Sequence, residues 1–480
     1  MTLLDIGIFI VGALLYAAFC PPRWRGWTLM VASVITIYWL QPALSIRYLD
    51  FWLPTLTLMI TVLCWLIVRQ SEDEARWLAR EDRVSLAVIV ALALLLAANR
   101  YLAAEVRLTP SRPPEITTVI LVLILIAALV LLVTRRWRDW RGWPGAAILA
   151  LVGIFVVVKA EPLAQGMSAV LRAGVGQDVT LASSIDLGWL GFSYVAFRLI
   201  HTLRDKQTGI LPPLNLREYL TYVIFFPAYT AGPIDRAGRF IVDYVALPKL
   251  RGLDAARITE GAGRIIVGLF KKFVIADSLA LIALDATKAA QADSAGGLWL
   301  LLYAYSFRLF FDFSGYSDIA IGIGILLGIR LPENFDRPYL KPNITAFWQS
   351  WHMSLTQWVR FYIFSPLSRS LLRRKQRPSN DVIMLICHLT TMIVIGLWHG
   401  VTWAFLVWGV WHGLALFAHK LWTDRTRAWV RGLGERPRLK AAYTVGGVLL
   451  TFHFVTLGWV WFALPDVTLA GDVLLRLFGG

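Results

Sequence analysis

Long apolar runs separated by short basic connectors are the feature that most constrains this chain. Six runs fill its first third, and each approaches the ~20 residues that a helix needs to cross a bilayer. They lie near residues 4–19, 27–44, 51–68, 84–102, 116–133 and 145–158. Hydrophobic residues make up 58% of the sequence, too many for a soluble fold to bury. We therefore expect an all-α, polytopic membrane protein with roughly ten to thirteen helices.

The net charge of +16 is concentrated in the connectors. Those after the first, third and fifth runs hold most of the early arginines, namely Arg23, Arg25, Arg69, Arg76, Arg80, Arg83, Arg135, Arg136, Arg138 and Arg141. Connectors rich in Lys and Arg stay in the cytoplasm, so the alternation predicts an external N-terminus and cytoplasmic odd-numbered connectors. Membrane topology accounts for the charge, and we expect no nucleic-acid partner.

The cysteines and the N-terminus suggest neither a disulfide framework nor a cleaved leader. Cys20, Cys64 and Cys387 lie in or beside apolar runs without CxxC spacing, so we expect them to pack as small hydrophobic residues. The opening MTLLDIGIFIVGALLYAAFC lacks a basic leader and is interpreted as a retained first helix.

The pattern changes at Ile185, where apolar runs become shorter and are interrupted by polar residues, Gly and Pro. Residues 161–184 read as an external loop with a short helix. Pro227, Gly232 and Pro233 must break the helix that enters FFPAYTAGPIDR, and broken backbone at membrane depth requires surrounding protein or a water-filled cavity. We divide the chain into a lipid-facing wall (1–184), a catalytic or transport core (185–464) and a C-terminal tail (465–480).

Several helices are expected within the core. Periodicity predicts one over 258–285, with Lys271 and Lys272 as interfacial anchors, and apolar runs follow at 298–313 and 315–328. Asn343 is a candidate N-cap for an amphipathic helix over 344–364, which would place His352 on one stripe with Trp348 and Trp351. The remaining runs are 382–398, 403–421 and 441–464, and basic residues in 368–380 mark that connector as cytoplasmic.

His399 is the strongest candidate for chemistry. It follows seven residues without a charge, and a titratable ring held away from water usually has a function. Neutral imidazole can accept a proton from an attacking hydroxyl near neutral pH, which is the profile of a general base in acyl transfer. The alternative is a core histidine that links two helices. Gly396, Gly400 and Gly409 favour the catalytic interpretation, because small residues permit close approach of helices or substrate.

The other histidines are weaker candidates. His352 is equally well explained as the polar edge of an amphipathic helix. His412 and His419 lie seven residues apart without an HxxxH cluster, so we expect no metal site. His201, His388 and His453 are interpreted as packing or hydrogen-bonding residues. No GxSxG, P-loop or dinucleotide motif accompanies them, which argues against a serine hydrolase, an NTPase or a dinucleotide enzyme.

Six segments together resemble the membrane-bound O-acyltransferase family. They are FFPAYTAGPIDR (225–236), GLFKKFVIAD (268–277), FFDFSGYSDIAIGIG (310–324), ENFDRPY (333–339), FWQSWHMSLTQW (347–358) and GLWHG (396–400). The resemblance covers roughly residues 187–463 and is nearest to the bacterial branch that contains the alginate O-acetylation membrane protein and the D-alanyl transfer protein of teichoic acid synthesis. Six motifs in order are more specific than any one alone.

The resemblance implies a fold and a site. His399 matches the family's active-site histidine and His352 its second histidine. The fold would be a ring of helices around a thin centre, with a cytoplasmic opening and an extracytoplasmic funnel that meet at His399. An acyl thioester, either acetyl-CoA or an acyl carrier protein, would approach as co-substrate from the cytoplasm. The acceptor, or an extracytoplasmic acyltransferase partner, would approach from outside, and no tightly bound cofactor is expected.

The sequence also departs from its relatives. Gln349 and Ser350 stand where relatives usually carry basic residues, and Phe361 stands where they carry Asp. FFPxxxxGPIDR is similar to the D-alanyl branch and SDIAIGIGILLGIRLPENF to the alginate branch, which leaves acceptor and donor open.

The function that we expect is transfer of an acetyl or other short acyl group to a hydroxyl of an exported or cell-envelope polysaccharide at a bacterial inner membrane. Trp351, Trp398, Asn334 and Asp312 are candidates for lining the passage. The alternatives are D-alanyl transfer to teichoic acid, acylation of a lipid or protein, and a transporter or flippase. A transporter would need two related halves, and the chain shows no duplicated motif.

Overall fold

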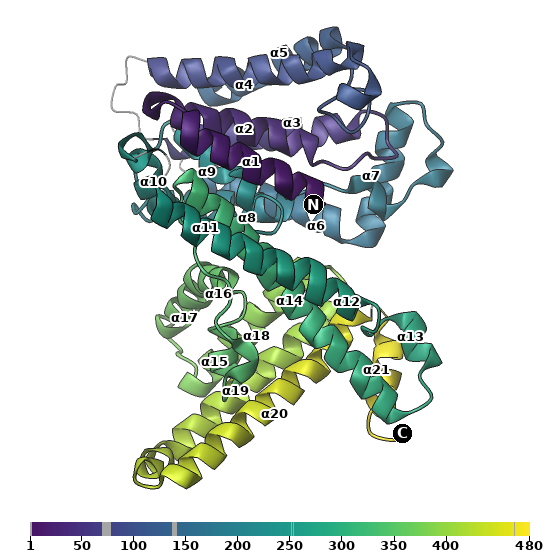
Figure 1. Cartoon of the computed structure of the whole chain (residues 1–480), viewed down its shortest axis with the longest axis vertical. Coiled ribbons are helices and arrows are strands. Elements are labelled where there is room, and N and C mark those ends of the chain that lie inside the picture. Colours follow the sequence, from purple (N-terminus) through teal and green to yellow (C-terminus); the bar gives the residue numbers. More distant parts are fainter. Residues whose placement is uncertain (1, 70–77, 137–141, 251, 253, 465) are drawn as a thin grey trace. The chain divides into compact units, whose positions relative to one another are not determined.

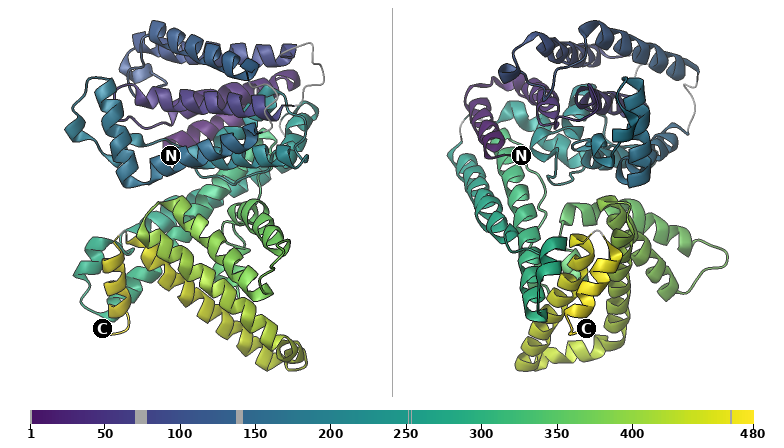
Figure 2. Two further views of the ribbon diagram at one scale, coloured as in Figure 1. Left: turned by 180° about the vertical axis from the view of Figure 1, so that it is seen from behind. Right: turned by 90° about the vertical axis from the view of Figure 1, so that its right-hand side faces the viewer.

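The computed structural model describes residues 2–69, 78–136, 142–250, 252, 254–464 and 466–480 (Figures 1 and 2). Helices account for most of these residues, and within them the only β-type pairing is an isolated antiparallel bridge between Phe335 and Trp351. The all-α prediction is confirmed.

The chain divides into two compact units. The first comprises Met1–Ala262 with Ala320–Leu331, and the second comprises Gly263–Ile319 with Pro332–Gly480. The predicted division at residues 184 and 464 concerned where the chemistry lies, and it stays a prediction.

The first unit is built from the N-terminal helices. They are α1 (Leu3–Phe19), α2 (Arg25–Trp39), α3 (Leu49–Val68), α4 (Arg80–Ala98), α5 (Ile116–Arg136), α6 (Trp143–Lys159), α7 (Glu161–Gly174), α8 (Phe192–Gln207), α9 (Leu216–Val223) and α10 (Ala237–Ala246), followed by the first half of α11 (Ala255–Leu269). Its core lies where α2, α3, α8 and α9 pack together, and there Tyr38, Leu199 and Tyr219 are fully buried.

The helix break predicted around FFPAYTAGPIDR (225–236) is confirmed. Helix α9 ends at Val223, and regular α-helix resumes only at Ala237. Arg198, buried in α8, donates hydrogen bonds to the carbonyl oxygens of Val223 (2.8 Å) and Ala228 (2.7 Å). His201 accepts a hydrogen bond from the backbone N–H of Ala237. Protein groups therefore satisfy carbonyl and N–H groups of the irregular segment that would otherwise lose their partners.

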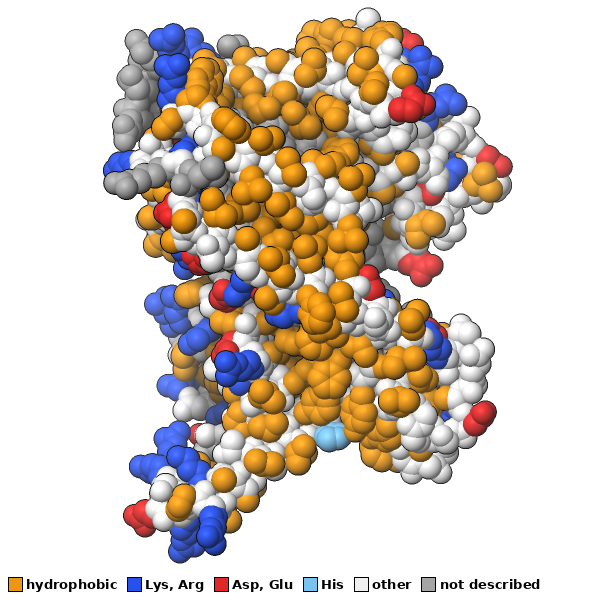
Figure 3. All heavy atoms as spheres, in the orientation of Figure 1, with side chains coloured by type: hydrophobic (Ala, Val, Ile, Leu, Met, Phe, Trp, Pro, Cys, Tyr) orange, Lys and Arg blue, Asp and Glu red, His pale blue; other side chains and the backbone are white. Residues whose placement is uncertain are grey.

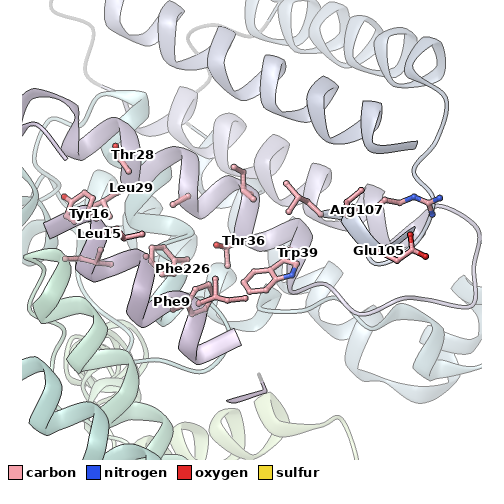
Figure 4. Close-up of a pocket in the computed structure, with 17 residues that line it drawn as sticks. Phe9, Leu15, Tyr16, Thr28, Leu29, Thr36, Trp39, Glu105, Arg107 and Phe226 are labelled. Atoms are coloured by element: carbon pink, nitrogen blue, oxygen red, sulfur yellow. The ribbon is translucent and has the colours of Figure 1, made fainter. Parts of the chain in front are cut away.

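A groove of about 730 Å³ lies in the first unit between α1 and α2 (Figure 4). Apolar side chains such as Phe9, Leu15 and Leu29 line most of it, and Glu105 and Arg107 stand at one end. None of the residues predicted to be catalytic contributes to its lining.

The second unit contains the rest of α11 and the C-terminal helices. They are α12 (Asp277–Ala280), α13 (Ala286–Gln291), most of α14 (Ala295–Leu327), α15 (Ile344–Trp348), α16 (Met353–Val359), α17 (Ser365–Leu372), α18 (Asn380–His399), α19 (Trp403–Gly432), α20 (Pro437–Ala463) and α21 (Val467–Arg476). Helices α18, α19 and α20 run side by side and pack in chain order (Figures 1 and 2).

Six helices of the described part are long and apolar enough to cross a membrane: α3, α4, α14, α18, α19 and α20. The bent pair α6 and α7, at 92°, would raise the number to seven, and α1 and part of α5 are shorter apolar helices. Hydrophobic side chains (orange) cover much of the face shown in Figure 3, as lipid contact requires. The protein is a multi-pass membrane protein, although these spans are fewer than the ten to thirteen expected.

Two predicted runs, 298–313 and 315–328, form one helix. Helix α14 passes through Gly315 without interruption for 33 residues. A Cβ atom on Gly315 would lie 2.8 Å from the carbonyl oxygen of Gly268, and one on Gly268 would lie 2.6 Å from that of Gly315. These glycines permit backbone contact between the two helices rather than a break. Just beyond Gly268, residues Phe270–Ala276 are π-helical.

The predicted helix over 344–364 is wrong in its middle. Asn343 does cap α15, accepting a hydrogen bond from the Ala346 N–H at 2.8 Å, but α15 ends at Trp348. Helix α16 begins only at Met353, so His352 does not lie on a helical stripe with Trp348 and Trp351. The short helix expected within the loop over 161–184 is α7, which occupies the first 14 of these residues.

Candidate active site

His399 is the last residue of α18. Carbonyl groups at a helix C-terminus lack intrahelical partners and carry partial negative charge, which stabilises a positive charge nearby. The imidazole is only partly buried. Its ring centroid lies 4.7 Å from that of Phe462, 5.7 Å from Phe405 and 5.8 Å from Trp408. Aromatic rings from α19 and α20 therefore surround a base that remains accessible.

The glycines near His399 serve the turn between α18 and α19. A Cβ atom on Gly396 would lie 2.3 Å from the carbonyl oxygen of Phe405, and one on Gly409 would lie 2.7 Å from the Cα of Ile393. Close helix packing thus explains these two glycines without a substrate. The same close packing of α18 and α19 determines the position of His399, which lies at the end of α18.

His352 occupies an unusual backbone position. Its φ of 43° and ψ of 54° are left-handed, a region that residues other than glycine rarely adopt. The side chain is buried, and neither ring nitrogen has a hydrogen-bond partner among the described residues. Burial lowers the pKa of His352 to about 3, and the nearby His399 acts in the same direction. The imidazole is therefore neutral at pH 7, and its nitrogens can serve a ligand.

Trp398 connects the two histidines. Its ring centroid lies 4.5 Å from that of His399 and 6.0 Å from that of His352. The Phe313 ring of α14 also contacts His352, edge-on at 4.6 Å. The structure thus brings His352, Trp398 and His399 into one group. His352 is the most buried of the three.

Asn334 and Trp351 lie in the same region but are buried. Trp351 stacks on Phe347 at 5.6 Å and contacts Trp459 at 5.2 Å, within an aromatic core. Asn334 accepts a hydrogen bond from the Ser354 hydroxyl at 2.6 Å. Both residues contact the backbone next to His352: Asn334 through Met353 and Ser354, and Trp351 as its direct neighbour. That they line a passage stays a prediction.

Asp312 takes part in a different interaction. It forms an ion pair with Lys272 at 2.5 Å, and its side chain is 47% exposed. Phe313, the next residue of α14, contacts His352, whereas the ion pair that the structure shows for Asp312 is with Lys272. The prediction that Asp312 lines the passage stays a prediction.

The remaining histidines have structural partners or packing. His453 bonds to the hydroxyl of Tyr303 at 2.9 Å, and His419 to that of Thr345 at 2.8 Å. His412 is buried edge-on to Trp348 at 5.2 Å. In the described part of the chain, no three His, Cys, Asp or Glu side chains cluster closely enough to hold a metal ion.

Four aromatic residues of the site were not predicted: Phe313, Phe405, Trp408 and Phe462. Phe462 belongs to the last span, which the sequence analysis treated as a plain helix. Its segment GWVWFAL is unusually rich in aromatic residues, and that was the available signal. Aromatic density alone does not say which rings will face a histidine.

Comparison with known proteins identifies the family. The profile of the membrane-bound O-acyltransferase family matches residues 27–449, which include both histidines. This chain belongs to that family. Membership places it among the acyltransferases and confirms the resemblance inferred from the six motifs.

Curated relatives within this family have different named substrates. The teichoic acid D-alanyltransferase of Streptococcus thermophilus is 34% identical, over 58% of this chain and 68% of the relative. The probable alginate O-acetylase AlgI of Pseudomonas syringae is 35% identical, over 60% of this chain and 51% of the relative. The peptidoglycan O-acetyltransferase of Helicobacter pylori is 34% identical, over 58% and 49% respectively. This chain thus spans about half the length of the last two relatives.

Proposed function

We propose that this protein transfers an acetyl or other short acyl group from a thioester to a hydroxyl of an exported or cell-envelope polysaccharide, in a bacterial cytoplasmic membrane. The observation that carries the proposal is the group formed by His399, Trp398 and His352. One imidazole is partly accessible, and a second is buried beside it with unpartnered nitrogens. The relatives named for alginate, peptidoglycan and teichoic acid support this class of acceptor.

The reaction needs one base that later returns its proton. A ring nitrogen of His399 removes the proton from the acceptor hydroxyl while the oxygen attacks the thioester carbonyl carbon. The tetrahedral intermediate collapses by breaking the C–S bond, and the departing sulfur takes the proton back from the imidazolium. An ester and a free thiol result. The C-terminus of α18 stabilises the positive charge that His399 carries in between.

His352 fits a positioning or proton-transfer role. Because its imidazole is neutral, one nitrogen carries a hydrogen and the other a lone pair. The N–H can donate to the oxygen that becomes negative in the intermediate, and such a donor is worth most where water is excluded. His352 is at such a position, because its side chain is only 2% exposed.

The proposal includes an acyl thioester donor on the cytoplasmic side and an acyltransferase partner outside. Acetyl-CoA and an acyl carrier protein share a thioester, so either suits the chemistry. An extracytoplasmic acyltransferase could accept the acyl group and pass it on to the polymer. D-alanyl transfer and acylation of a lipid or protein would use the same histidines and differ only in the acceptor.

The test uses full-length protein purified in detergent and reconstituted with acetyl-CoA and candidate polysaccharides. We expect release of CoA and acetylation that depend on His399. Replacing His399 with Ala or Gln should lower the rate by about 10² to 10⁴-fold, the contribution of a general base. The matched control is His453→Gln, which removes a histidine that bonds to Tyr303 and should leave the rate within a few-fold of the starting protein.

Two outcomes would contradict the proposal. The first is an unchanged rate in a folded His399→Ala protein. The second is movement of a polysaccharide or lipid across liposomes without any consumption of thioester, which would indicate a transporter. A carrier-bound D-alanyl thioester in place of acetyl-CoA distinguishes the two acyl groups.

A further inference from the structure

We infer that Asn334 is a positioning residue that holds His352 in its left-handed turn and ties that turn to α14. The inference rests on the proposed function, because His352 is taken to act in the reaction. It goes further by assigning the segment Glu333–Asp336 the task of setting the geometry of this histidine.

Both ends of the Asn334 side-chain amide form hydrogen bonds. Its amide nitrogen donates to the Ser317 hydroxyl of α14 at 3.1 Å. Its amide oxygen accepts from the hydroxyl of Ser354 at 2.6 Å and from the Ser354 N–H at 3.4 Å. Asn334 is 1% exposed, and Ser317 and Ser354 are also buried. Water cannot replace these bonds, so each lost partner would leave a buried polar group unsatisfied.

The backbone of the same segment flanks His352 on both sides. Before the histidine, Phe335 and Trp351 form the antiparallel bridge, and the Asp336 N–H bonds to the Ser350 carbonyl at 3.0 Å. After it, the Met353 N–H bonds to the Asn334 carbonyl at 2.9 Å. The backbone is therefore held by hydrogen bonds immediately before and immediately after His352. A strained conformation persists only where surrounding contacts determine it in this way.

The segment is itself anchored to a rigid frame. Arg264 of α11 forms ion pairs with Asp318 of α14, at 2.8 Å, and with Glu333, which precedes Asn334. Lys271 bonds to the same Asp318 at 2.6 Å. Next to Asp318 on α14 is Ser317, the partner of Asn334. Nearby, the backbones of α11 and α14 are in contact at Gly268 and Gly315. Asn334 therefore fixes the position of His352 relative to this pair of helices.

The first experiment measures the turn without any reaction. Hydrogen exchange by mass spectrometry is followed for peptides that cover residues 350–356, in the purified full-length protein. Replacing Asn334 with Ala should accelerate exchange at Ser354 by about tenfold or more, because its N–H loses the side-chain oxygen of Asn334. Exchange at Met353 should rise as well if the turn loosens, although its acceptor, the Asn334 backbone carbonyl, remains. Unchanged exchange in a folded Asn334→Ala protein would overturn the inference. The control is Asn215→Ala, which removes a helix-capping amide in the first unit and should leave this peptide unaffected.

The second experiment is kinetic. Asn334→Ala should lower kcat by about 10 to 100-fold with little change in the KM for acetyl-CoA, as expected where reacting groups are misplaced. Ser354→Ala keeps the Ser354 amide and should show a smaller loss; it also serves if Asn334→Ala fails to fold. The double variant of Asn334→Ala with His352→Ala should be no slower than His352→Ala alone, because the amide acts through the imidazole.

The outcomes separate this inference from the proposed function. Additive losses in the double variant, or a raised KM with unchanged kcat, would show that Asn334 does not act through His352. Activity that depends on His399 but not on Asn334 would overturn the inference and leave the function standing. Absence of acyl transfer in the starting protein would contradict the function, and the exchange experiment would still decide whether Asn334 holds the turn.

Discussion

The residue on which the site geometry depends most is His352. A side chain with a Cβ atom disfavours positive φ by roughly 1–2 kcal/mol relative to glycine. The chain nevertheless places histidine at φ 43° between two anchored backbone points. In this conformation the imidazole contacts the rings of Phe313, at 4.6 Å, and Trp398, at 6.0 Å. A helical residue here would point elsewhere, so the imidazole's position follows from the strained turn.

This strain predicts that Gly is preferred to Ala at residue 352, the reverse of the order found within a regular helix. Replacements by Gly and by Ala both remove the imidazole, but Gly adopts positive φ without penalty. We expect His352→Gly to be more stable than His352→Ala by about 1 kcal/mol, measured by thermal unfolding in detergent. Both variants should be slower than the starting protein by a similar and measurable factor, because both lack the imidazole.

The matched control is Gln357, exposed within α16. At a regular helical position the order is reversed, and Gln357→Gly should be less stable than Gln357→Ala by about 0.5–1 kcal/mol. If Ala were preferred at both positions, the left-handed turn would not exist in solution.

At the scale of elements, the crossing of α11 and α14 matters most. The α11 backbone touches the α14 backbone at Gly268 and Gly315, and the π-helical segment follows directly. Close to this crossing, Asp318 of α14 forms ion pairs with Arg264 and with Lys271. These pairs satisfy charges on helices that otherwise suit an apolar environment.

Two glycines of α11 should therefore respond in opposite ways to a methyl group. Gly268→Ala places its Cβ 2.6 Å from a carbonyl oxygen and should destabilise the protein by about 1–3 kcal/mol, the usual effect of overpacking. Gly263→Ala meets no atom within 4 Å and should stabilise the helix by about 0.5–1 kcal/mol. Thermal unfolding of both variants checks this, and equal shifts would mean that the helices do not touch.

At the scale of the whole molecule, orientation in the membrane follows from charge. The strongly basic connectors predict their own cytoplasmic location, and the much less basic connectors between them, with Arg47 in one and Arg107 and Arg112 in the other, predict the opposite side. The proposed reaction needs this polarity, because the thioester and the acceptor must reach the histidines from different compartments.

Cysteine labelling tests that orientation. In a Cys20→Ser background, where Cys64 and Cys387 are buried, we expect Ala104→Cys to react with a membrane-impermeant maleimide in intact cells. Gln376→Cys, in the basic connector after α17, should react only after the membrane is opened. Both positions are exposed, so access rather than burial decides the result. The reverse labelling pattern would invert the topology.

Much of the fold could be predicted because its signals are local. Apolar runs of helical length identified the class, Asn343 marked the start of α15, and the prolines and glycines after Tyr222 marked a break. His399 stood out because a histidine beside glycine in an apolar segment is rare. Each of these signals depends on a few neighbouring residues.

The sequence by itself determined an all-α membrane protein of this family and a histidine at the end of an apolar run, because hydropathy and capping act over one or two turns. Only the tertiary structure decided that the helix over 344–364 stops at Trp348, that His352 takes a left-handed turn, and that Asn334 holds it. The reason is physical: the contacts that stabilise that turn come from residues 333–336 and from α14, and local periodicity carries no information about such distant partners.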